Sequence, residues 1–560
     1  MRVVLTPQRS DEQRPLGPLL AACALAVLAL KLCVLALPPL ELSPVHIPGT
    51  PPGLPGYEEW RRGMAAEEWL RGPLLPWLDY QQGHFQGGTL VTIGLAALSF
   101  AALGPSPFAM RLPNVLFDIA GVLALVWLVD RAAGRRAARY TALFATLAAP
   151  GYWVVGAAAW ASHVESNGQA CVLLALWARH VFFGARARSA AFGLGAVAGL
   201  ALWYHYGVAL WLAVMLAVEL AHAPRRFFGT ALLWRCAGFA VGLIPWFVYN
   251  VRYDWAGLGL YGRSAGEHVQ LDLSRAVVAF RELWVEFLPG STWIPDFFGV
   301  AGSGRALGHC AVLAAVAAWL HGTRRALLRW RGERTVGPEA VFILQPALWA
   351  LAYSFGEFHG DRKWAQGYRY MLAIHPAAWA LGGIALAALA ARARTLARVT
   401  ATIAAAILLA GLGALLRPAH LPLAFEAPGR NLESLGRWLF HRRLESADIL
   451  VRAAERLVAE REPLEQDVVL FTLGNTLAYQ ASAPPPSAEA GPAALAAHAA
   501  AQAHARTAAA ALATAVPEPY RPYFAPLEPG ERPWSWAQRD QFWRQWDRRG
   551  VGRPNGAYRH

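Results

Sequence analysis

Apolar stretches long enough to cross a lipid bilayer recur along most of the chain. The first runs from Leu16 to Leu37, and the last ends near Leu416. An α-helix needs about 20 apolar residues to span the hydrocarbon core. Hydrophobic residues make up 56% of the 560 residues and charged residues only 16%, which is more apolar material than one soluble core needs. The sequence therefore predicts an all-α membrane protein with many crossings.

The basic residues are concentrated in short connections between these apolar stretches. Five arginine clusters fall within residues 131–139, 179–188, 225–235, 324–334 and 392–398. Positive charge of this kind marks the loops that stay in the cytoplasm. The net charge of +14 therefore reflects membrane topology and gives no reason to expect a nucleic-acid partner.

Alternating these clusters with outside loops predicts about eleven membrane spans. The predicted spans are 16–37, 112–130, 139–157, 169–184, 189–203, 206–222, 229–250, 307–323, 337–355, 373–391 and 399–416. An odd number puts residues 1–15 in the cytoplasm and residues 417–560 outside. A further span at 89–103 would move the cluster at 131–139 to the outside, so we expect that stretch to be a helix lying in the outer interface.

Polar residues gather in the connections that are predicted to face outside. The first is the long loop 38–111, the second is 157–169, and two more follow Asn250 and Phe355. A transporter would instead place its polar residues near the bilayer midplane on broken helices. Four polar loops on one face indicate a site there and favour an enzyme over a transporter.

Carboxylates stand out in two of these loops. Glu58 and Glu59 follow a Pro/Gly-rich approach and begin the helical pattern WRRGMAAEEWL. Either they interact with the helix dipole or they carry chemistry, and we favour chemistry. Glu165 lies with His163 in a short hairpin, either as an acid and an imidazole held for function or as an ordinary polar turn.

Two charged residues fall inside predicted spans. Lys31 either reaches a lipid phosphate or, as we expect, snorkels outward along its span. Asp118, near the start of the second span, either supports a site on the outer face or makes a structural hydrogen bond.

The segment 417–560 has a different character from the membrane part. GRNLESLGRWLFHRRLESADILVRAAERLVAE predicts amphipathic helices, and EAGPAALAAHAAAQAHARTAAAALATAV predicts an alanine-rich helix that follows the breaker ASAPPPSAEAG. We expect a small, mainly helical domain outside the membrane.

The order of these pieces resembles a known family of membrane enzymes. The resemblance rests on YEEWRRGMAAEEWLRGP, HFQGGTLVTIGLAALSF, GPSPFAMRLPNVLF, GRRAARYTALFATLAAP and GYRYMLAIHPAAWAL. Together they look like the GT-C membrane glycosyltransferases, in the group of protein O-mannosyltransferases, aminoarabinose transferases and RgtA/B/C/D-like enzymes. The resemblance covers the membrane part, residues 16–416, and implies a GT-C-like bundle; it does not account for the segment 417–560.

The resemblance implies a reaction at the outer, periplasmic face of the bacterial inner membrane. A hexosyl or pentosyl group would pass from a polyprenyl-phosphate carrier to a lipid, glycan or protein acceptor. The alternative that we keep is a transporter or flippase for a lipid-linked glycan.

The resemblance also assigns roles to residues. It places catalysis on Glu58, with Glu59 adjacent, and a second acidic role on Glu165. The leaving phosphate needs cations, and Arg369 is the best placed, although it is also what a snorkelling arginine would look like. The other residues that we expect near the phosphate are Lys363, Arg362 and Tyr368, and those that we expect near the substrate are His84, His163, Arg252, Tyr370 and Asp118.

The chain departs from the family pattern at two points. The family usually has Asp where this chain has Glu58, and often a His-Pro-Pro stretch where this chain has His84 followed by FQGG. The extra methylene moves the carboxylate by roughly 1.5 Å, the length of one carbon–carbon bond. Whether a divalent cation takes part is therefore left open.

Overall fold

The computed structural model describes the helices of the membrane part and most of the C-terminal helices. The described residues are 15–36, 62–63, 65–66, 69–70, 77–81, 87–104, 106–157, 162–184, 187–253, 255–260, 263–264, 272–292, 301–355, 370–415, 447–460, 463–482 and 491–526. They fall into two compact units. The first unit lies within residues 1–37, 84–88 and 111–421, and the second within 38–83, 89–110 and 422–560.

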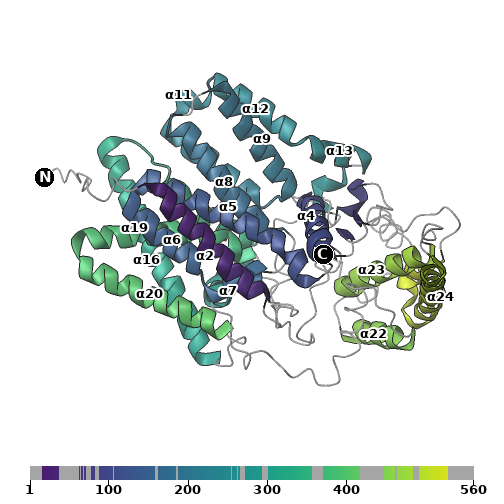
Figure 1. Cartoon of the computed structure of the whole chain (residues 1–560). Helices are drawn as coiled ribbons and strands as arrows, with labels where there is room; N and C mark the ends of the chain where they lie inside the picture. The colour runs from purple at the N-terminus through teal and green to yellow at the C-terminus, as the bar shows by residue number, and fades with distance from the viewer. Residues whose placement is uncertain are drawn as a thin grey trace. The chain divides into compact units, whose positions relative to one another are not determined.

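The first unit is a bundle of helices (Figure 1). Its helices are α2 (Leu16–Ala36), α5 (Pro107–Ala133, from Arg111 on), α6 (Arg135–Leu147), α7 (Pro150–Ala157), α8 (His163–Val181), α9 (Arg188–Tyr204), α10 (Val208–His222), α11 (Pro224–Phe227), α12 (Thr230–Gly242), α13 (Ile244–Arg252), η3 (Ala256–Leu258), α14 (Leu273–Glu282), η5 (Leu283–Phe287), α15 (Leu288–Thr292), α16 (Ala301–Glu333), α17 (Ala340–Phe355), η8 (Leu372–Ile374), α19 (His375–Arg392) and α20 (Arg394–Leu415). One short antiparallel ladder pairs β1 (Gly259–Leu260) with β2 (Arg263–Ser264). The all-helical prediction is confirmed.

Every predicted span lies on a helix. Among the described residues, five helices are long and apolar enough to cross a membrane, or six if α12 and α13, bent by 46° at Leu243, form one span. The apolar helices α4 (Gly88–Leu103), α10 and α17 are shorter. The chain is therefore a multi-pass membrane protein, and the count of eleven crossings stays a prediction.

Two predicted spans are each divided between two helices. The stretch 229–250 is divided between α12 and α13 at Leu243. The stretch 139–157 is divided between α6 and α7, because Ala148 takes a positive φ of 38° and Pro150 begins the next helix. Proline is suited to the first position of a helix, where no backbone N–H is needed. The Trp153 indole donates to the carbonyl oxygen of Leu147 at 2.6 Å, so the break is bridged by a side chain.

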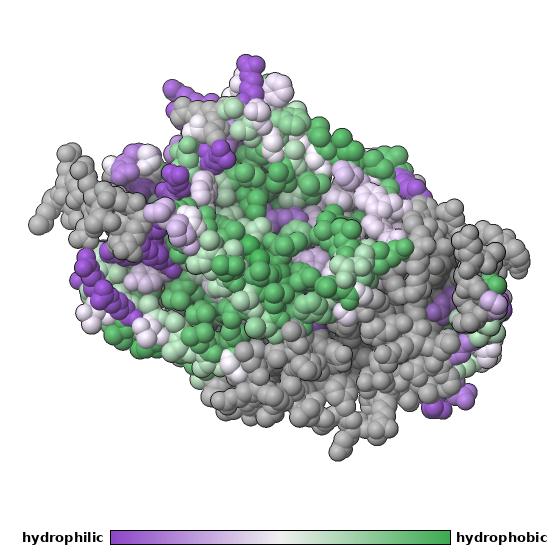
Figure 2. Space-filling view, viewed as in Figure 1, coloured by the Kyte–Doolittle hydropathy of each residue, from purple (hydrophilic) through white to green (hydrophobic). Residues whose placement is uncertain are grey.

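The first unit has a broad apolar surface. On the face shown in Figure 2, hydrophobic residues form a broad area over the bundle, and hydrophilic residues gather at its margins. On α16, Leu313, Leu320 and Leu327 are all more than half exposed and recur every seven residues, which keeps them on one face of the helix. Exposed apolar surface on this scale indicates contact with lipid.

Helices α9 and α12 lie side by side in direct backbone contact (Figure 1). Each carries two glycines four residues apart, Gly195 and Gly199 on α9 and Gly238 and Gly242 on α12. A Cβ atom at any of these positions would overlap a backbone oxygen of the facing helix. This is the small-residue packing that lets membrane helices approach closely.

The second unit contains η2 (Trp77–Tyr80), α4 from Thr89 on, α22 (Ala447–Glu460), α23 (Pro463–Ser482), α24 (Gly491–Ala515) and η12 (Glu518–Phe524). The predicted alanine-rich helix is confirmed as α24, which packs against both α22 and α23. Phe471 of α23 meets Tyr523 of η12 edge to face, with ring centroids 5.2 Å apart. The C-terminal helices therefore have an apolar core of their own.

We expect the change Gly238→Ala to destabilise the first unit. The new methyl group would overlap the carbonyl oxygen of Phe192, so α9 and α12 must move apart, at a cost of about 1–3 kcal/mol in the free energy of unfolding. Thermal unfolding in detergent measures it. The matched control is Gly193→Ala on α9, where nothing lies within 4 Å of an added Cβ atom. Equal melting temperatures for the two variants would contradict the direct backbone contact.

Candidate functional site

Helix α8 begins at the centre of the candidate site. Ser162, directly before it, is buried and has a φ of 62°, in the left-handed region. Glu165 lies in the first turn of α8 with a fully buried side chain. A carboxylate at this place interacts favourably with the positive end of the helix dipole. Glu165 therefore belongs to a buried helix start.

Three rings from distant parts of the sequence meet beside this helix start. The His163 ring lies 4.7 Å from that of His205 and 5.0 Å from that of Tyr370, centroid to centroid. His205 follows the last residue of α9, and Tyr370 stands just before η8. The loop around residue 163 and the loop after Phe355 are thus brought together, as expected of one site.

Two glycines within the first predicted outer loop reach the same place. The backbone N–H of Gly87 donates to the carbonyl oxygen of Trp203 at 3.1 Å, two residues before His205. A side chain at Gly87 would overlap the Trp203 indole, and one at Gly88 would overlap the Tyr204 ring. The glycines that follow His84 therefore let the backbone pass close to the end of α9.

His205 was not predicted as a site residue. Its Nδ1 accepts a hydrogen bond from the backbone N–H of Gly207 at 3.0 Å, which leaves the ring proton of the neutral form on Nε2. The side chain is buried, next to His163. The only sequence signal was its position between two apolar stretches, where a polar residue is usual.

Two amides hold the segment that follows Tyr370. Asn167 of α8 donates to the carbonyl oxygen of Leu372 at 2.6 Å, and Gln345 of α17 donates to that of Ala373 at 3.0 Å. Both amide side chains are buried. The Leu372 carbonyl oxygen also accepts from the His375 backbone N–H, so the two amides add side-chain bonds that fix the path of η8 and with it the place of Tyr370.

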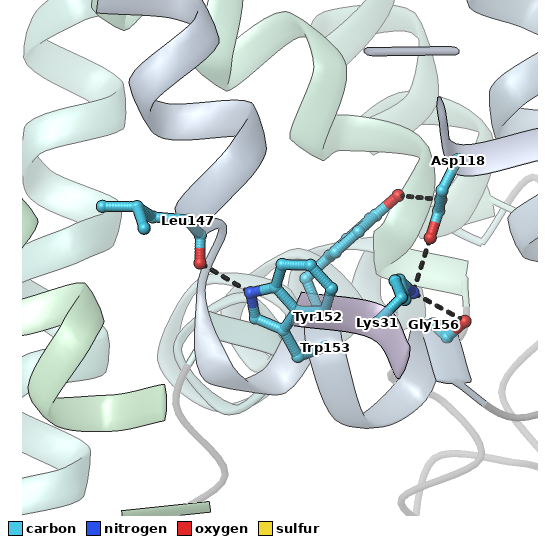
Figure 3. A network of polar contacts seen from close by, with 6 residues as sticks. All are labelled: Lys31, Asp118, Leu147, Tyr152, Trp153 and Gly156. Atoms are coloured by element: carbon cyan, nitrogen blue, oxygen red, sulfur yellow. Dashed lines mark hydrogen bonds and ion pairs between the residues drawn. The ribbon is translucent and has the colours of Figure 1, made fainter. Parts of the chain in front are cut away.

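A buried ion pair lies behind the site (Figure 3). Lys31 Nζ of α2 is 2.5 Å from Asp118 Oδ2 of α5 and donates to the carbonyl oxygen of Gly156 of α7 at 3.0 Å. The Tyr152 hydroxyl donates to Asp118 Oδ1 at 2.9 Å. Lys31 is 1% exposed, so the expectation that it snorkels outward is wrong. Its charge is satisfied inside the bundle, where the partner could not be seen from local sequence.

An apolar cavity adjoins the segment that carries Tyr370. Its volume is about 520 Å³, within the range of small-molecule sites. Met371, the residue after Tyr370, lines it, and so does His375 at the start of α19. The hydroxyls of Ser291 and Thr292 donate to carbonyl oxygens of their own helix turn, so they leave the cavity wall apolar. The cavity therefore suits a hydrocarbon chain.

The wall of the cavity includes an unusual helix. Residues Leu283–Phe287 form a π-helix, a conformation that is frequent at functional sites, and Leu283 and Trp284 line the cavity. Asp272 caps the preceding helix α14. Its carboxylate accepts hydrogen bonds from the Ser274 hydroxyl and from the Ser274 and Arg275 backbone N–H groups. The bond from the Ser274 hydroxyl, then those from the backbone, lower the pKa of Asp272.

The remaining predicted site residues divide into two groups. Arg252 is exposed at the end of α13, with its guanidinium 5.6 Å from the ring centroid of Tyr253. The others lie outside the described residues: Glu58, Glu59, His84, Arg362, Lys363, Tyr368 and Arg369. Within the described ranges, no three His, Cys, Asp or Glu side chains lie together as ligands for a metal ion.

Two solved structures are similar to this chain. One is ArnT from Cupriavidus metallidurans bound to undecaprenyl phosphate, with 18% identity, coverage of 85% of this chain and 82% of that chain, and a TM-score of 0.47. The other is the oligosaccharyltransferase of Archaeoglobus fulgidus in the apo form, with 14% identity, coverage of 77% and 58%, and a TM-score of 0.45. No protein-family model and no curated protein matches the sequence. The case for a function therefore rests on the chain's own residues.

We expect Asn167→Leu to loosen the join between α8 and η8. The change removes a 2.6 Å hydrogen bond while the Leu372 carbonyl oxygen keeps the backbone N–H of His375, so we expect a cost of about 0.5–1.5 kcal/mol in the free energy of unfolding. Thermal unfolding in detergent again measures it. Ser166→Ala is the matched control, because the Ser166 hydroxyl bonds within its own turn, to the carbonyl oxygen of His163. A melting temperature for Asn167→Leu no lower than that of the control would contradict this role.

Proposed function

We propose that the chain is a GT-C-like membrane glycosyltransferase that moves a sugar from a polyprenyl-phosphate carrier to a lipid, glycan or protein acceptor. One observation carries the proposal. Tyr370 contacts His163, two residues from buried Glu165, and Met371 directly after it lines an apolar cavity of about 520 Å³. A polar site and a compartment for a hydrocarbon chain thus share one segment, which is what a donor with a charged head and an isoprenoid tail requires.

The chemistry asks for a proton acceptor and for cations. The acceptor hydroxyl attacks the anomeric carbon of the sugar, its proton passes to a carboxylate, and the bond from that carbon to the phosphate oxygen breaks. The electron pair of that bond leaves with the carrier phosphate. We assign the proton to Glu58, supported by Glu59, and a second acidic role in binding the substrate to Glu165.

Positive charge is assigned to the segment just before Tyr370. Arg369 stands next to it in the sequence, with Tyr368, Lys363 and Arg362 preceding. Charge-assisted bonds from such residues would hold the phosphate as its negative charge grows.

The arginine-rich helix ends support the proposed orientation. Arg131, Arg179 and Arg392 lie in the last turns of α5, α8 and α19, whereas Glu165 and His375 stand in the first turns of α8 and α19. If the arginines face the cytoplasm of a bacterium, the site faces the periplasm. Residues 1–15 would then be cytoplasmic and 417–560 periplasmic, with the inner membrane as the location.

Transport of a lipid-linked glycan is the weaker alternative. Its signature would be a broken helix that offers polar groups near the middle of the membrane. The chain does bend between α12 and α13, but at the bend the Leu243 N–H donates to the carbonyl oxygen of Phe239, and the Leu243 carbonyl oxygen accepts from the N–H of Phe247. Both backbone groups of the bend residue are paired, so the bend offers little to a passing substrate.

Glu165→Gln tests the proposed reaction. If the Glu165 carboxylate binds the substrate, we expect sugar transfer to fall about 100- to 10,000-fold. The Gln side chain keeps the shape of Glu165 and loses its carboxylate charge. Surface glycolipids and glycans are compared at equal protein levels, together with the melting temperature of the purified protein. Glu286→Gln is the control, since Glu286 is an exposed carboxylate of the same unit. An unchanged sugar profile with Glu165→Gln would count against this site.

Ala315→Phe tests whether the cavity receives the carrier tail. The added ring would occupy part of the cavity from α16, so we expect the KM for a long-chain donor to rise about tenfold. A short-chain donor that does not fill the cavity should keep its KM. Leu320→Phe is the control, because Leu320 lies on the same helix and is 56% exposed. Equal effects of Ala315→Phe on long and short donors would place the tail elsewhere.

A further inference from the structure

The buried ion pair of Lys31 and Asp118 is linked through neighbouring residues to two parts of the candidate site, the start of α8 and the start of α19. Figure 3 shows the ammonium of Lys31 between Asp118 and the carbonyl oxygen of Gly156, and the Tyr152 hydroxyl bonded to the other oxygen of the same carboxylate. The ammonium also lies 5.1 Å from the ring centroid of Trp153. Three helices, α2, α5 and α7, are therefore joined at one charged point.

The first path runs along α5 to Glu165. The carbonyl oxygen of Phe117, the residue before Asp118, lies against Gly168, where an added Cβ atom would overlap it. One turn later, a Cβ atom added at Gly121 would lie 2.8 Å from the Cα atom of the same Gly168. No side chain separates α5 from the start of α8, so a shift of α5 at Asp118 must move the turn that carries Glu165.

The second path runs through Tyr152 to the start of α19. Its ring lies 5.1 Å from the ring of His375 and 4.8 Å from that of Trp379, centroid to centroid, and its hydroxyl is fixed by Asp118. His375 lines the apolar cavity and directly follows η8. The ion pair thus also sets the position of the segment between Tyr370 and the cavity.

The third contact fixes the end of α7. Lys31 binds the carbonyl oxygen of Gly156 in the last turn of this helix, where a cation interacts favourably with the helix dipole. Residues 158–161 then lead to Ser162 and α8. The ammonium therefore anchors the chain just before it enters the candidate site.

We propose that Lys31, Asp118 and Tyr152 are positioning residues, which hold the start of α8 and the start of α19 in register for sugar transfer. The kinetic part of its test rests on the proposed function, because it measures sugar transfer. Burying an ion pair costs desolvation, and apolar residues of similar volume often stabilise a fold as well or better. The Asp118 carboxylate binds two partners, and so does the Lys31 ammonium. Apolar packing does not reproduce the directed geometry that these bonds impose.

The test removes both charges together. In Lys31→Met/Asp118→Leu no lone charge stays buried, so the protein is expected to fold with a melting temperature close to that of the wild type. We expect kcat to fall about 10- to 100-fold with little change in the KM for the donor, because a small misplacement of reacting groups is costly. Hydrogen exchange of the amides in residues 163–168 should become about tenfold faster.

The matched control is the second buried ion pair of the same unit. Arg235 of α12 lies 2.5 Å from Glu219 of α10, and the Trp177 indole donates to the same carboxylate. This pair stands near the ends of α8 and α10 that are opposite to Glu165 and His205. Arg235→Met/Glu219→Leu should leave kcat and the exchange of residues 163–168 as in the wild type.

Tyr152→Phe provides a milder variant should the double change prevent folding. It removes only the hydroxyl that binds Asp118, and we expect a smaller fall in kcat in the same direction. Wild-type kcat and wild-type exchange in Lys31→Met/Asp118→Leu, or in a folded Tyr152→Phe, would overturn the positioning role. Equal losses in the control pair would do so as well, because they would show a general effect of buried charge.

Failure of the proposed function would look different. In that case the wild type itself would transfer no sugar from any polyprenyl-phosphate donor, and the kinetic comparison would fall away. Hydrogen exchange would still decide the positioning role, because it needs no substrate. Faster exchange at 163–168 in the Lys31 and Asp118 variant alone would support it, and equal exchange in all variants would refute it.

Discussion

Polar groups inside an apolar bundle need partners inside that bundle, and the structure of the first unit depends on this constraint. Water is absent from the middle of a membrane, so a charge or an irregular carbonyl group must find its partner on another helix. Lys31 finds Asp118 and Gly156, and the carbonyl oxygen of Leu372 finds Asn167. Each such contact joins segments far apart in the sequence, and these segments form or adjoin the candidate site.

Hydropathy and charge predicted the helices well because both are local properties. Every predicted span lies on a helix, including the two short ones that became α9 and α10. The breaks between α6 and α7 and between α12 and α13 were missed, because hydropathy continues through both. At the first break, a positive φ at Ala148 and a proline at 150 interrupt the backbone. Long-range partners were also missed: nothing near Lys31 in the sequence points to Asp118.

The candidate site was predicted in part, and the reason is similar. Glu165, His163 and Tyr370 were singled out from their loops or from the family resemblance, and the structure brings His163 and Tyr370 into ring contact. His205 was overlooked because a single histidine between two apolar stretches reads as an ordinary connection. The cavity could not be predicted either, since its wall combines residues of several helices with a π-helical turn. The hydrophobic periodicity of the sequence does not indicate such a turn.

The contact between α9 and α12 shows that a few small residues are enough to bring two membrane helices into close contact. Where Gly195, Gly199, Gly238 and Gly242 meet the facing backbone, the decisive feature is a hydrogen atom in place of a side chain. Residues on the lipid side of both helices can drift among apolar types without disturbing the pair. The close contact of the two helices therefore depends on the absence of side chains at these four positions.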